Sequence, residues 1–165
     1  MDNEVRLRTV SKSDLPIFYE HQADPEAAQM AAFPSREHAA FMAHWAKILD
    51  DENNIIKTIL FQGQVAGNVL SFIMDGRREV GYWLGREFWG RGIATRALSA
   101  FLEQVTERPL YAYVAKHNLG SLRVLQKCGF HIIREEPSRS DPPGRVIEYY
   151  VLELAGNEKK TWDEP

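Results

Sequence analysis

Hydrophobic and polar residues alternate over residues 5–10, which predicts a β-strand because successive side chains of a strand point to opposite faces. The polar run 11–14 then supplies helix-capping side chains and predicts the start of a helix. A small-residue stretch with a proline at 30–34 leads to a second expected cap, Ser35. The apolar residues after this cap recur at helical spacing and are expected to face a core: Phe41, Met42, Trp45, Ile48 and Leu49.

The middle of the chain has the pattern of an antiparallel meander. Runs typical of β-strands at 55–61, 65–74 and 79–84 are separated by the turn signals Gln62-Gly63 and Asp75-Gly76. The Asp-Gly pair is a strong hairpin signal, because both central residues of a type I′ turn need a positive φ. These runs therefore predict three neighbouring antiparallel strands.

The spacing of apolar residues becomes helical after a loop at 85–89 and the glycine-rich residues 90–92. The helix predicted there presents the apolar residues Ile93, Ala97, Leu98, Phe101, Leu102 and Val105. A strand at 109–115 and a short helix at 121–128 follow, and Gly129 is expected to end that helix.

Two final strands are expected at 130–134 and 146–154, separated by a proline-rich loop at 137–144. The pattern as a whole predicts an α+β (mixed α/β) fold with a central, mostly antiparallel sheet. One domain is expected to span residues 1–155, and residues 156–165 form a polar C-terminal tail.

Composition narrows the functional class. The 165 residues are 44% hydrophobic and 26% charged, which is typical of one globular domain and not of a disordered chain. The formal net charge is −3 and the sequence pI is about 6.0. Because no basic stripe accompanies this charge, nucleic acid is not an expected partner.

Cysteine and histidine usage argues against disulfides and metals. Cys128 is the single cysteine, which excludes an intrachain disulfide and fits a reducing, cytoplasmic setting. The five histidines lack the HxxxH spacing of a helical metal site, so no metal is expected. The charged residues 1–8 do not resemble a secretory signal, and no apolar run approaches the roughly 20 residues of a membrane helix.

Residues 89–95, Trp-Gly-Arg-Gly-Ile-Ala-Thr, lie between a β-run and a helix. The first N–H groups of a helix have no intrahelical partner and lie at the positive end of its dipole, and glycines let a phosphate approach this backbone. Arg91 and Thr95 add a charged and a hydroxyl donor. A plain strand-to-helix turn explains the same glycines, so this motif alone leaves both interpretations open.

A second cluster lies at residues 118–130. Asn118 and Ser121 are polar side chains at the entry of the short helix that follows the strand. A simple helix cap at Asn118, and a helix stop followed by a strand at Gly129-Phe130, explain the cluster equally well when it is taken alone.

Together, in this order and spacing, the two clusters resemble the GNAT superfamily of acyl-CoA N-acyltransferases over residues 5–154. That family has a Q/R-x-x-G-x-G/A loop opening a helix, and then N-x-x-S/A with a downstream K-x-G-F. The matching residues here are Gly92, Ala94, Asn118, Ser121, Lys127, Gly129 and Phe130. The segment 81–84 before residues 89–92, with Trp89 in place of Q/R, is most similar to the RimJ/RimL-type branch of ribosomal-protein alanine N-acetyltransferases.

The resemblance implies a seven-stranded sheet with about four flanking helices, in which the strands 79–84 and 110–115 splay apart in a V to admit acetyl-CoA. The pyrophosphate would be held by the amides of Trp89, Gly90, Arg91, Gly92, Ile93, Ala94 and Thr95. The pantetheine arm would pair with Val80, Gly81, Tyr82, Trp83 and Leu84, one of whose N–H groups would stabilise the thioester oxygen. Asn118, Ser121 and Lys127 complete the expected cofactor-binding set.

Acetyl transfer to an amine needs a base, because an alkylammonium titrates near pH 10 and an α-ammonium near pH 8. Glu79 is the candidate, acting through water, and Glu148 on the last strand is the second candidate. The alternative for Glu79 is that it has no catalytic role and is simply an exposed strand carboxylate next to Arg77 and Arg78.

The leaving thiolate needs an acid, and here the chain departs from its relatives. Many family members carry Tyr five residues before the Phe of K-x-G-F, where this chain has Leu125. Ser121 is the first replacement and Tyr82 the second. Covalent catalysis at Cys128 is disfavoured, because small apolar packing is the ordinary use of a cysteine at the end of a short helix.

The acceptor site is expected from the first two helices and the loop before the last strand. Met30, Phe33 and Tyr82 are candidate walls, and Glu135, with Glu136 and Asp141, could attract a cation. Core packing of Phe33 and simple solvation of the acidic residues remain the alternatives.

The predicted function is transfer of an acetyl group from acetyl-CoA to a primary amine, either a protein N-terminus or a small molecule. The alternatives are a degenerate CoA-binding sensor, motivated by Leu125, and an enzyme for another acyl-CoA donor. The expected partner is the amine alone, without nucleic acid or membrane, in a monomer or a homodimer.

Overall fold

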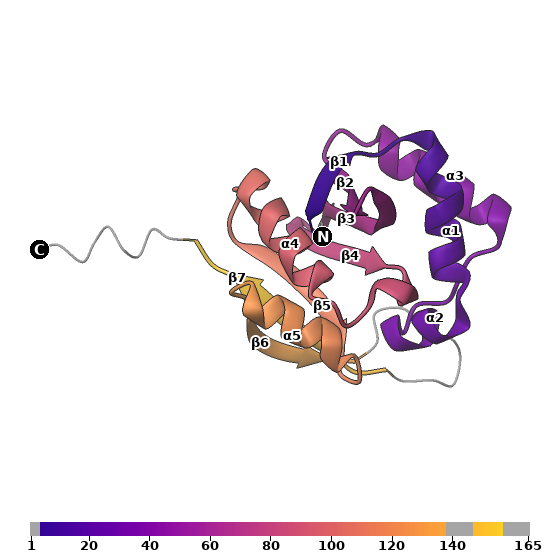
Figure 1. The fold of residues 1–165 in the computed structure, drawn as a ribbon. Coiled ribbons are helices and arrows are strands. Elements are labelled where there is room, and N and C mark those ends of the chain that lie inside the picture. The colour runs from indigo at the N-terminus through magenta and orange to yellow at the C-terminus, as the bar shows by residue number, and fades with distance from the viewer. Residues whose placement is uncertain (1–3, 138–146, 157–165) are drawn as a thin grey trace, which may run out of the picture.

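The computed structural model describes residues 4–137 and 147–156 of the chain. Seven strands form one sheet in the order β1-β2-β3-β4-β5-β7-β6 (Figure 1). Their bounds are β1 Val5–Thr9, β2 Ile55–Phe61, β3 Gln64–Met74, β4 Arg77–Leu84, β5 Leu110–Ala115, β6 His131–Glu136 and β7 Tyr149–Leu154. The described part of the chain also has five α-helices, α1 Leu15–Ala23, α2 Pro25–Ala31, α3 His38–Asp50, α4 Ile93–Gln104 and α5 Leu119–Lys127.

Helices cover both faces of the sheet and create two hydrophobic clusters. α4 and α5 pack on one face over a large core whose fully buried members include Phe101 and Phe130. α1 and α3 pack on the other face around Phe18, Phe41 and Trp45. Figure 1 shows these two helix layers, with α2 and α5 at the lower side of the molecule. The predicted α+β fold with a mostly antiparallel sheet is therefore confirmed.

Tight turns fix the register of the central meander. Asp75 and Gly76 both have positive φ, 53° and 78°, as the predicted type I′ hairpin requires. Gln62 and Gly63 adopt the same left-handed conformation between β2 and β3. The three strands pair antiparallel throughout, so the meander predicted from the sequence is confirmed.

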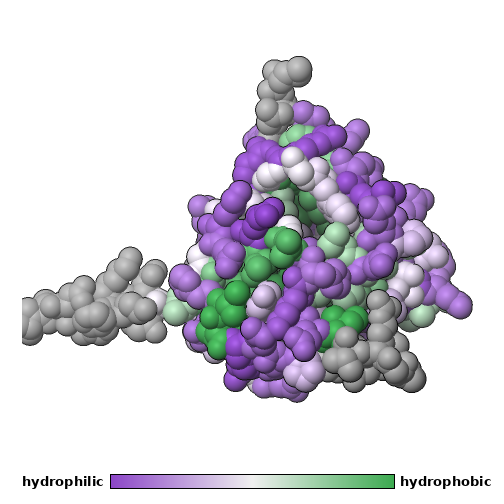
Figure 2. Space-filling view, turned by 90° about the horizontal axis from the view of Figure 1, so that it is seen from below, coloured by the Kyte–Doolittle hydropathy of each residue, from purple (hydrophilic) through white to green (hydrophobic). Residues whose placement is uncertain are grey.

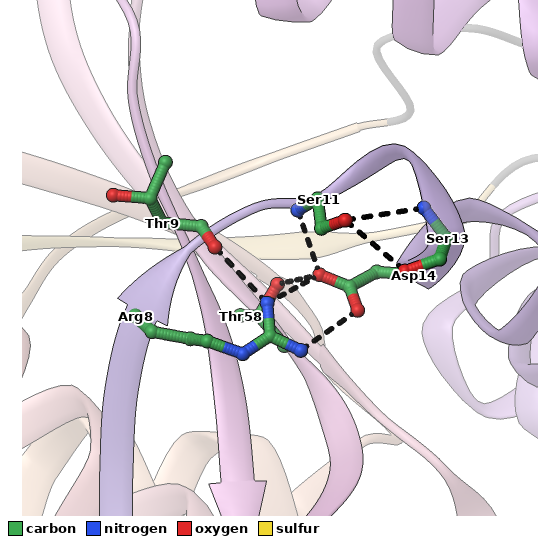
Figure 3. Close-up of polar contacts among 6 residues, drawn as sticks. All are labelled: Arg8, Thr9, Ser11, Ser13, Asp14 and Thr58. Atoms are coloured by element: carbon green, nitrogen blue, oxygen red, sulfur yellow. Dashed lines mark hydrogen bonds and ion pairs between the residues drawn. The ribbon is translucent and has the colours of Figure 1, made fainter.

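The start of α1 is attached to the sheet by a buried carboxylate, shown in Figure 3. Asp14 accepts hydrogen bonds from both terminal nitrogens of Arg8, from Ser11 N and from Thr58 Oγ1. Ser11 Oγ in turn accepts from Ser13 N, which completes a capping box. Burial by itself raises the pKa of Asp14, but the four hydrogen bonds outweigh it and lower the pKa to about 2.

Several element boundaries differ from those expected. The helix α2 was missed altogether, and α3 begins at His38 with Glu37 at its N-cap, so the predicted cap at Ser35 is wrong. Leu49 is exposed and does not face the core. The expected strand start at Val146 lies outside the described residues.

The sheet opens between β4 and β5. These strands are the parallel pair, and their register contains only Glu79 opposite Tyr111. All other neighbouring strands pair antiparallel over five or more positions. β4 therefore diverges from β5 after Glu79, which confirms the V-shaped splay between strands 4 and 5.

Candidate active site

A cleft of about 630 Å³ lies beside the C-terminal half of β4, and its size is typical of a small-molecule site. Its walls come from β4, the start of α4, α5 and α2. It brings together most of the predicted site residues, namely Met30, Tyr82, Trp83, Leu84, Trp89, Gly90, Gly92, Ile93, Ala94, Thr95, Asn118, Ser121 and Lys127. The predicted residues that do not line it are Phe33, Glu79, Val80, Gly81, Arg91, Glu135 and Glu148.

The positive end of α4 faces this cleft. Gly92, the N-cap residue, has φ 75° and ψ 9°, and Gly90 has φ 76°, a left-handed conformation that favours glycine. The first helical hydrogen bond runs from Arg96 N to Gly92 O at 3.2 Å. The N–H groups of residues 93–95 precede that bond, and no side chain caps the helix. An anionic group in the cleft would therefore meet unpaired backbone donors.

Trp89 attaches the glycine-rich turn to the sheet. Its indole Nε1 donates a hydrogen bond to the carbonyl of Leu84, the last residue of β4, at 3.0 Å. The Arg91 guanidinium lies over the rings of Phe61 and Phe88, 5.7 and 6.0 Å from their centroids. The Arg91 side chain is therefore held outside the cleft, while Trp89 lines it.

The start of α5 forms the opposite wall. Asn118 Oδ1 accepts a hydrogen bond from Ser121 N at 3.2 Å, so Asn118 does cap this helix while it also lines the cleft. Arg123 and Lys127 are spaced one turn apart on α5 and both line the cleft. Two cations thus line the same cleft as the positive end of α4, an arrangement that complements phosphate groups.

Two hydroxyl groups meet inside the cleft. The Tyr82 hydroxyl donates a hydrogen bond to Ser121 Oγ at 3.1 Å, joining β4 to α5. Burial raises the pKa of Tyr82, against a smaller opposite effect of the hydrogen bond with Ser121, so the phenol stays protonated at neutral pH. Leu125, at the position where many relatives have tyrosine, is buried in the core and offers no proton.

The two candidate bases have different surroundings. Glu79 is only 3% exposed and lies at the vertex of the splay, opposite Tyr111. Glu148 is exposed and accepts a hydrogen bond from Lys116 Nζ at 2.7 Å, which lowers the pKa of Glu148 and makes it a weaker base. Lys116 also binds Glu135, the predicted cation-attracting residue.

Cys128 is not arranged as a nucleophile. Its thiol is partly buried, and burial raises its pKa, so the reactive thiolate is depleted at neutral pH. Its Sγ atom lies 3.6 Å from the carbonyl oxygen of Thr95, in the first turn of α4. Packing between α4 and α5 accounts for this residue.

One end of the cleft is apolar. Ala27, Met30 and Ala31 of α2 line it together with Trp83. The exposed ring of Phe33, which follows α2, meets the Trp83 ring edge-on at a centroid distance of 6.4 Å. Phe33 is therefore not a core residue.

Sequence reasoning missed part of the lining, namely Ala27, Ala31, Phe88, His117, Leu119, Gly120, Arg123 and Val124. Two sequence signals could have indicated some of these residues. Asp24 followed by Pro25 is a helix start, and Asp24 Oδ1 indeed accepts from Glu26 N at 3.2 Å. Arg123 lies four residues before Lys127, so a helix places both on one face. His117, whose Nε2 shares a hydrogen bond with Gln29 O at 3.0 Å, gave no local signal.

Other site types receive no support from the described residues. Within residues 4–137 and 147–156, no three His, Cys, Asp or Glu side chains are grouped to hold a metal ion. No described helix has the length and apolar character needed to cross a membrane. On the face seen in Figure 2, hydrophobic side chains gather in patches divided by hydrophilic ones.

Comparison with known proteins identifies the class. A family model described as an acetyltransferase (GNAT) domain matches residues 4–131. The chain therefore belongs to the GNAT acetyltransferase family, and it is an N-acetyltransferase that uses a CoA-type acyl donor. The residues present fit such a donor, because the cleft joins uncapped helix amides, two cations and the open edge of β4.

Individual relatives are distant. An uncharacterized N-acetyltransferase, p20 of Bacillus licheniformis, is 24% identical over 168 residues, which cover 92% of this chain and 93% of that protein. Among solved structures, RimL, a ribosomal L7/L12 alpha-N-protein acetyltransferase in complex with coenzyme A, has a TM-score of 0.79 at 16% identity, covering 92% of this chain and 94% of its own. A spermidine N-acetyltransferase from Vibrio cholerae, in complex with CoA and spermine, also has a TM-score of 0.79, at 15% identity, with coverage of 92% and 95%.

Proposed function

We propose that this protein transfers an acetyl group from acetyl-CoA directly to a primary amine. The observation that carries the proposal is the cleft that joins the uncapped start of α4 to Tyr82, Trp83 and Leu84, on the part of β4 that has diverged from β5. An acceptor amine is supported by the similar structures, one of which is a ribosomal-protein acetyltransferase and the other a spermidine acetyltransferase.

Donor binding is assigned to three groups of residues. The backbone of residues 89–95 and the cations Arg123 and Lys127 bind the phosphates. The edge of β4 at residues 80–84, which β5 leaves unpaired beyond Glu79, binds the pantetheine arm by hydrogen bonds of the strand type. Bound acetyl-CoA supplies a thioester whose carbonyl oxygen gains negative charge during attack, and a β4 N–H group stabilises that charge.

Glu79 is the proposed base, acting through a water molecule. Its position at the vertex of the splay places a carboxylate where the cofactor side and the acceptor side of the sheet meet. Glu148 is the weaker candidate, because the hydrogen bond from Lys116 stabilises its charged form. An α-amine, which titrates near pH 8, would need less assistance than an alkylamine.

Ser121 and Tyr82 together are the proposed acid. Ser121 Oγ donates its proton to the leaving sulfur, and the Tyr82 hydroxyl, already directed at Ser121 Oγ, returns a proton to Ser121. Water reprotonates the Tyr82 phenolate once CoA has left the cleft. The raised pKa of Tyr82 keeps this supply of protons available at neutral and mildly alkaline pH. Tyr82 of β4 and Ser121 of α5 thus take the proton-donating role that Leu125 cannot perform.

The family branch, the domain bounds and the cellular location are proposed mainly from the sequence. The segment 81–84 with Trp89 in place of Q/R supports membership of the RimJ/RimL-like branch. The domain is proposed to comprise residues 1–155, since the last strand ends at Leu154, and the lone cysteine supports a cytoplasmic location.

A thermal melt with acetyl-CoA, CoA or ATP tests the donor site. Ligand at about 100 times its dissociation constant stabilises the folded state by roughly 2.7 kcal/mol, a shift of several degrees for a chain of this size. We expect a shift with acetyl-CoA and CoA but not with ATP, and thiol release when an amine is added. No shift with either CoA compound would contradict the donor site, and binding without turnover of any amine would favour a CoA sensor.

Gly92→Val and Gly63→Val are matched variants for this melt. Both glycines have positive φ, and a Cβ at either position meets no atom within 4 Å, so the backbone strain is comparable. Only Gly92 lines the cleft. We expect Gly92→Val to abolish the shift with acetyl-CoA, while Gly63→Val lowers the starting melting temperature but keeps the shift.

A further inference from the structure

The location of the acceptor-binding end of the cleft can be deduced from the alternation of side chains along β4. Tyr82 and Trp83 are neighbours in this strand, so their side chains point to opposite faces of the sheet. Tyr82 contacts α5 on the cofactor face, whereas Trp83 meets Phe33 next to α2. The splay between β4 and β5 connects the two faces. The end of the cleft between Trp83 and α2 is therefore where an amine would meet the acyl group, if the proposed function is correct.

This end is walled by apolar side chains. Ala27, Met30 and Ala31 project from α2, and the Trp83 ring closes the wall from β4. Phe33, which does not itself line the cleft, is 47% exposed and packs edge-on against Trp83. An aliphatic or aromatic body placed here would bury apolar surface on these side chains, which favours binding.

No carboxylate lines the cleft among the residues that the structure describes. The proposed base Glu79 is buried at the vertex of the splay and does not line the cleft, and the other acidic residues nearby each contact a basic side chain. Glu135 and Glu148 both bind Lys116 Nζ. The acidic residues at the start of α2 are paired in the same way, since Asp24 and Glu26 both bind Arg86.

A second cationic group on the acceptor would therefore enter an apolar wall without a partner. Removing an ammonium from water is strongly unfavourable unless a carboxylate or several hydrogen bonds replace the lost hydration. We propose that the acceptor is a primary amine on an apolar aliphatic or aromatic body with no second cationic group. This inference rests on the proposed function, and it distinguishes the chain from the structurally similar spermidine N-acetyltransferase.

Two small amines provide a matched test. n-Pentylamine and 1,4-diaminobutane have the same number of non-hydrogen atoms and differ in whether the far end is a methyl or an ammonium group. With saturating acetyl-CoA, we expect kcat/KM for n-pentylamine to exceed that for the diamine by about 100-fold, because the ammonium is desolvated without a partner. Equal or greater kcat/KM for the diamine would overturn the proposal and leave the proposed function intact.

A pair of variants tests whether the apolar wall at α2 is where the acceptor binds. Met30→Glu places a carboxylate in the apolar wall, so we expect the preference for n-pentylamine to fall by about 10-fold. Met74→Glu is the control, because Met74 is 40% exposed at the end of β3 and does not line the cleft. Circular dichroism melts verify that both variants fold. An unchanged preference in Met30→Glu would refute the assignment of the wall.

A direct binding measurement separates the two hypotheses. If CoA binds but neither amine yields product, these two amines are not acceptors, while the wall remains testable. Calorimetry of each amine with CoA-loaded protein then decides. Tighter binding of n-pentylamine supports the apolar acceptor site, and equal or tighter binding of the diamine overturns it.

Discussion

At the scale of single residues, the contact between Tyr82 and Ser121 is the most informative feature of the cleft. A phenol can supply a proton only while it is protonated, and burial raises the pKa of Tyr82, so this condition holds well above neutral pH. Tyr82→Phe removes the hydroxyl with little change in shape. We expect kcat to fall by roughly 100-fold, the lower end of the usual contribution of general acid–base groups, while the dissociation constant of CoA stays within about twofold.

Tyr150→Phe is the control for this variant. Tyr150 packs against the same core from β7 but does not line the cleft, so its hydroxyl should be dispensable for turnover. Single-turnover kinetics and CoA titrations of both variants separate chemistry from binding. Equal losses in the two variants would mean that the effect of Tyr82→Phe is structural, and an unchanged rate would leave Ser121 as the sole acid.

The residue scale also shows what the sequence could not reveal. The glycine-rich turn was predictable, because residues 89–95 act through their own backbone at a helix start. The contact between Tyr82 and Ser121 joins residues 39 positions apart and depends on how α5 packs on β4. The ion pairs that occupy Glu135 and Glu148 depend on the pairing of β5, β6 and β7.

At the scale of elements, the Asp14 carboxylate joins the first turn before α1 to β1 and β2 through Arg8 and Thr58. Its folded-state pKa of about 2 lies below the ordinary value of 3.8. The ionised carboxylate therefore stabilises the fold by about 2 kcal/mol above pH 4, and this contribution disappears as the pH falls from about 4 toward 2.

Asp14→Asn should reduce the free energy of unfolding by about 2 kcal/mol at pH 7, measured by urea titration. The difference between the variant and the wild type should narrow as the pH is lowered to 3. Asp50→Asn at the exposed end of α3 is the control, with an expected change within about 0.5 kcal/mol. A difference for Asp14→Asn that does not depend on pH would contradict the ionic origin of the stabilisation.

Element boundaries were predictable where a capping side chain acts locally and less so elsewhere. The polar run at Ser11 to Asp14 forms a genuine capping box on the 3₁₀ turn Lys12–Asp14 that leads directly into α1, so this helical segment was found. α3 begins with Glu37 at its N-cap and no capping side chain, so the hydroxyl at Ser35 misled the prediction. The short helix α2 buries only Ala27, which is too little for a visible apolar period.

At the scale of the whole molecule, the division of the sheet at β4 and β5 links the fold to the proposed activity. The antiparallel strands and their two helix layers form hydrophobic clusters on both faces, so the opening is held by a packed framework on each side. Parallel pairing is limited to Glu79 and Tyr111. The edge of β4 beyond Glu79 is thus a strand edge kept inside the molecule, where backbone groups remain available to a ligand.

Hydrogen exchange should detect this edge. We expect amides in residues 80–84 that point toward β5 to exchange faster than those of β2, which is paired on both sides. Saturating CoA should slow exchange in residues 80–84 and in 93–95 by at least about 10-fold, because the pantetheine arm and phosphates accept hydrogen bonds from those amides. β2 should change little and serves as the internal control.

The pattern of protection distinguishes two arrangements. Protection at both segments requires a ligand that spans the cleft from the start of α4 to the splay, as acetyl transfer demands. Protection at residues 93–95 alone would mean that the phosphates bind but the arm does not enter between β4 and β5. That outcome would contradict the proposed placement of the thioester beside Glu79, because a donor held only by its phosphates leaves the reacting carbon outside the splay.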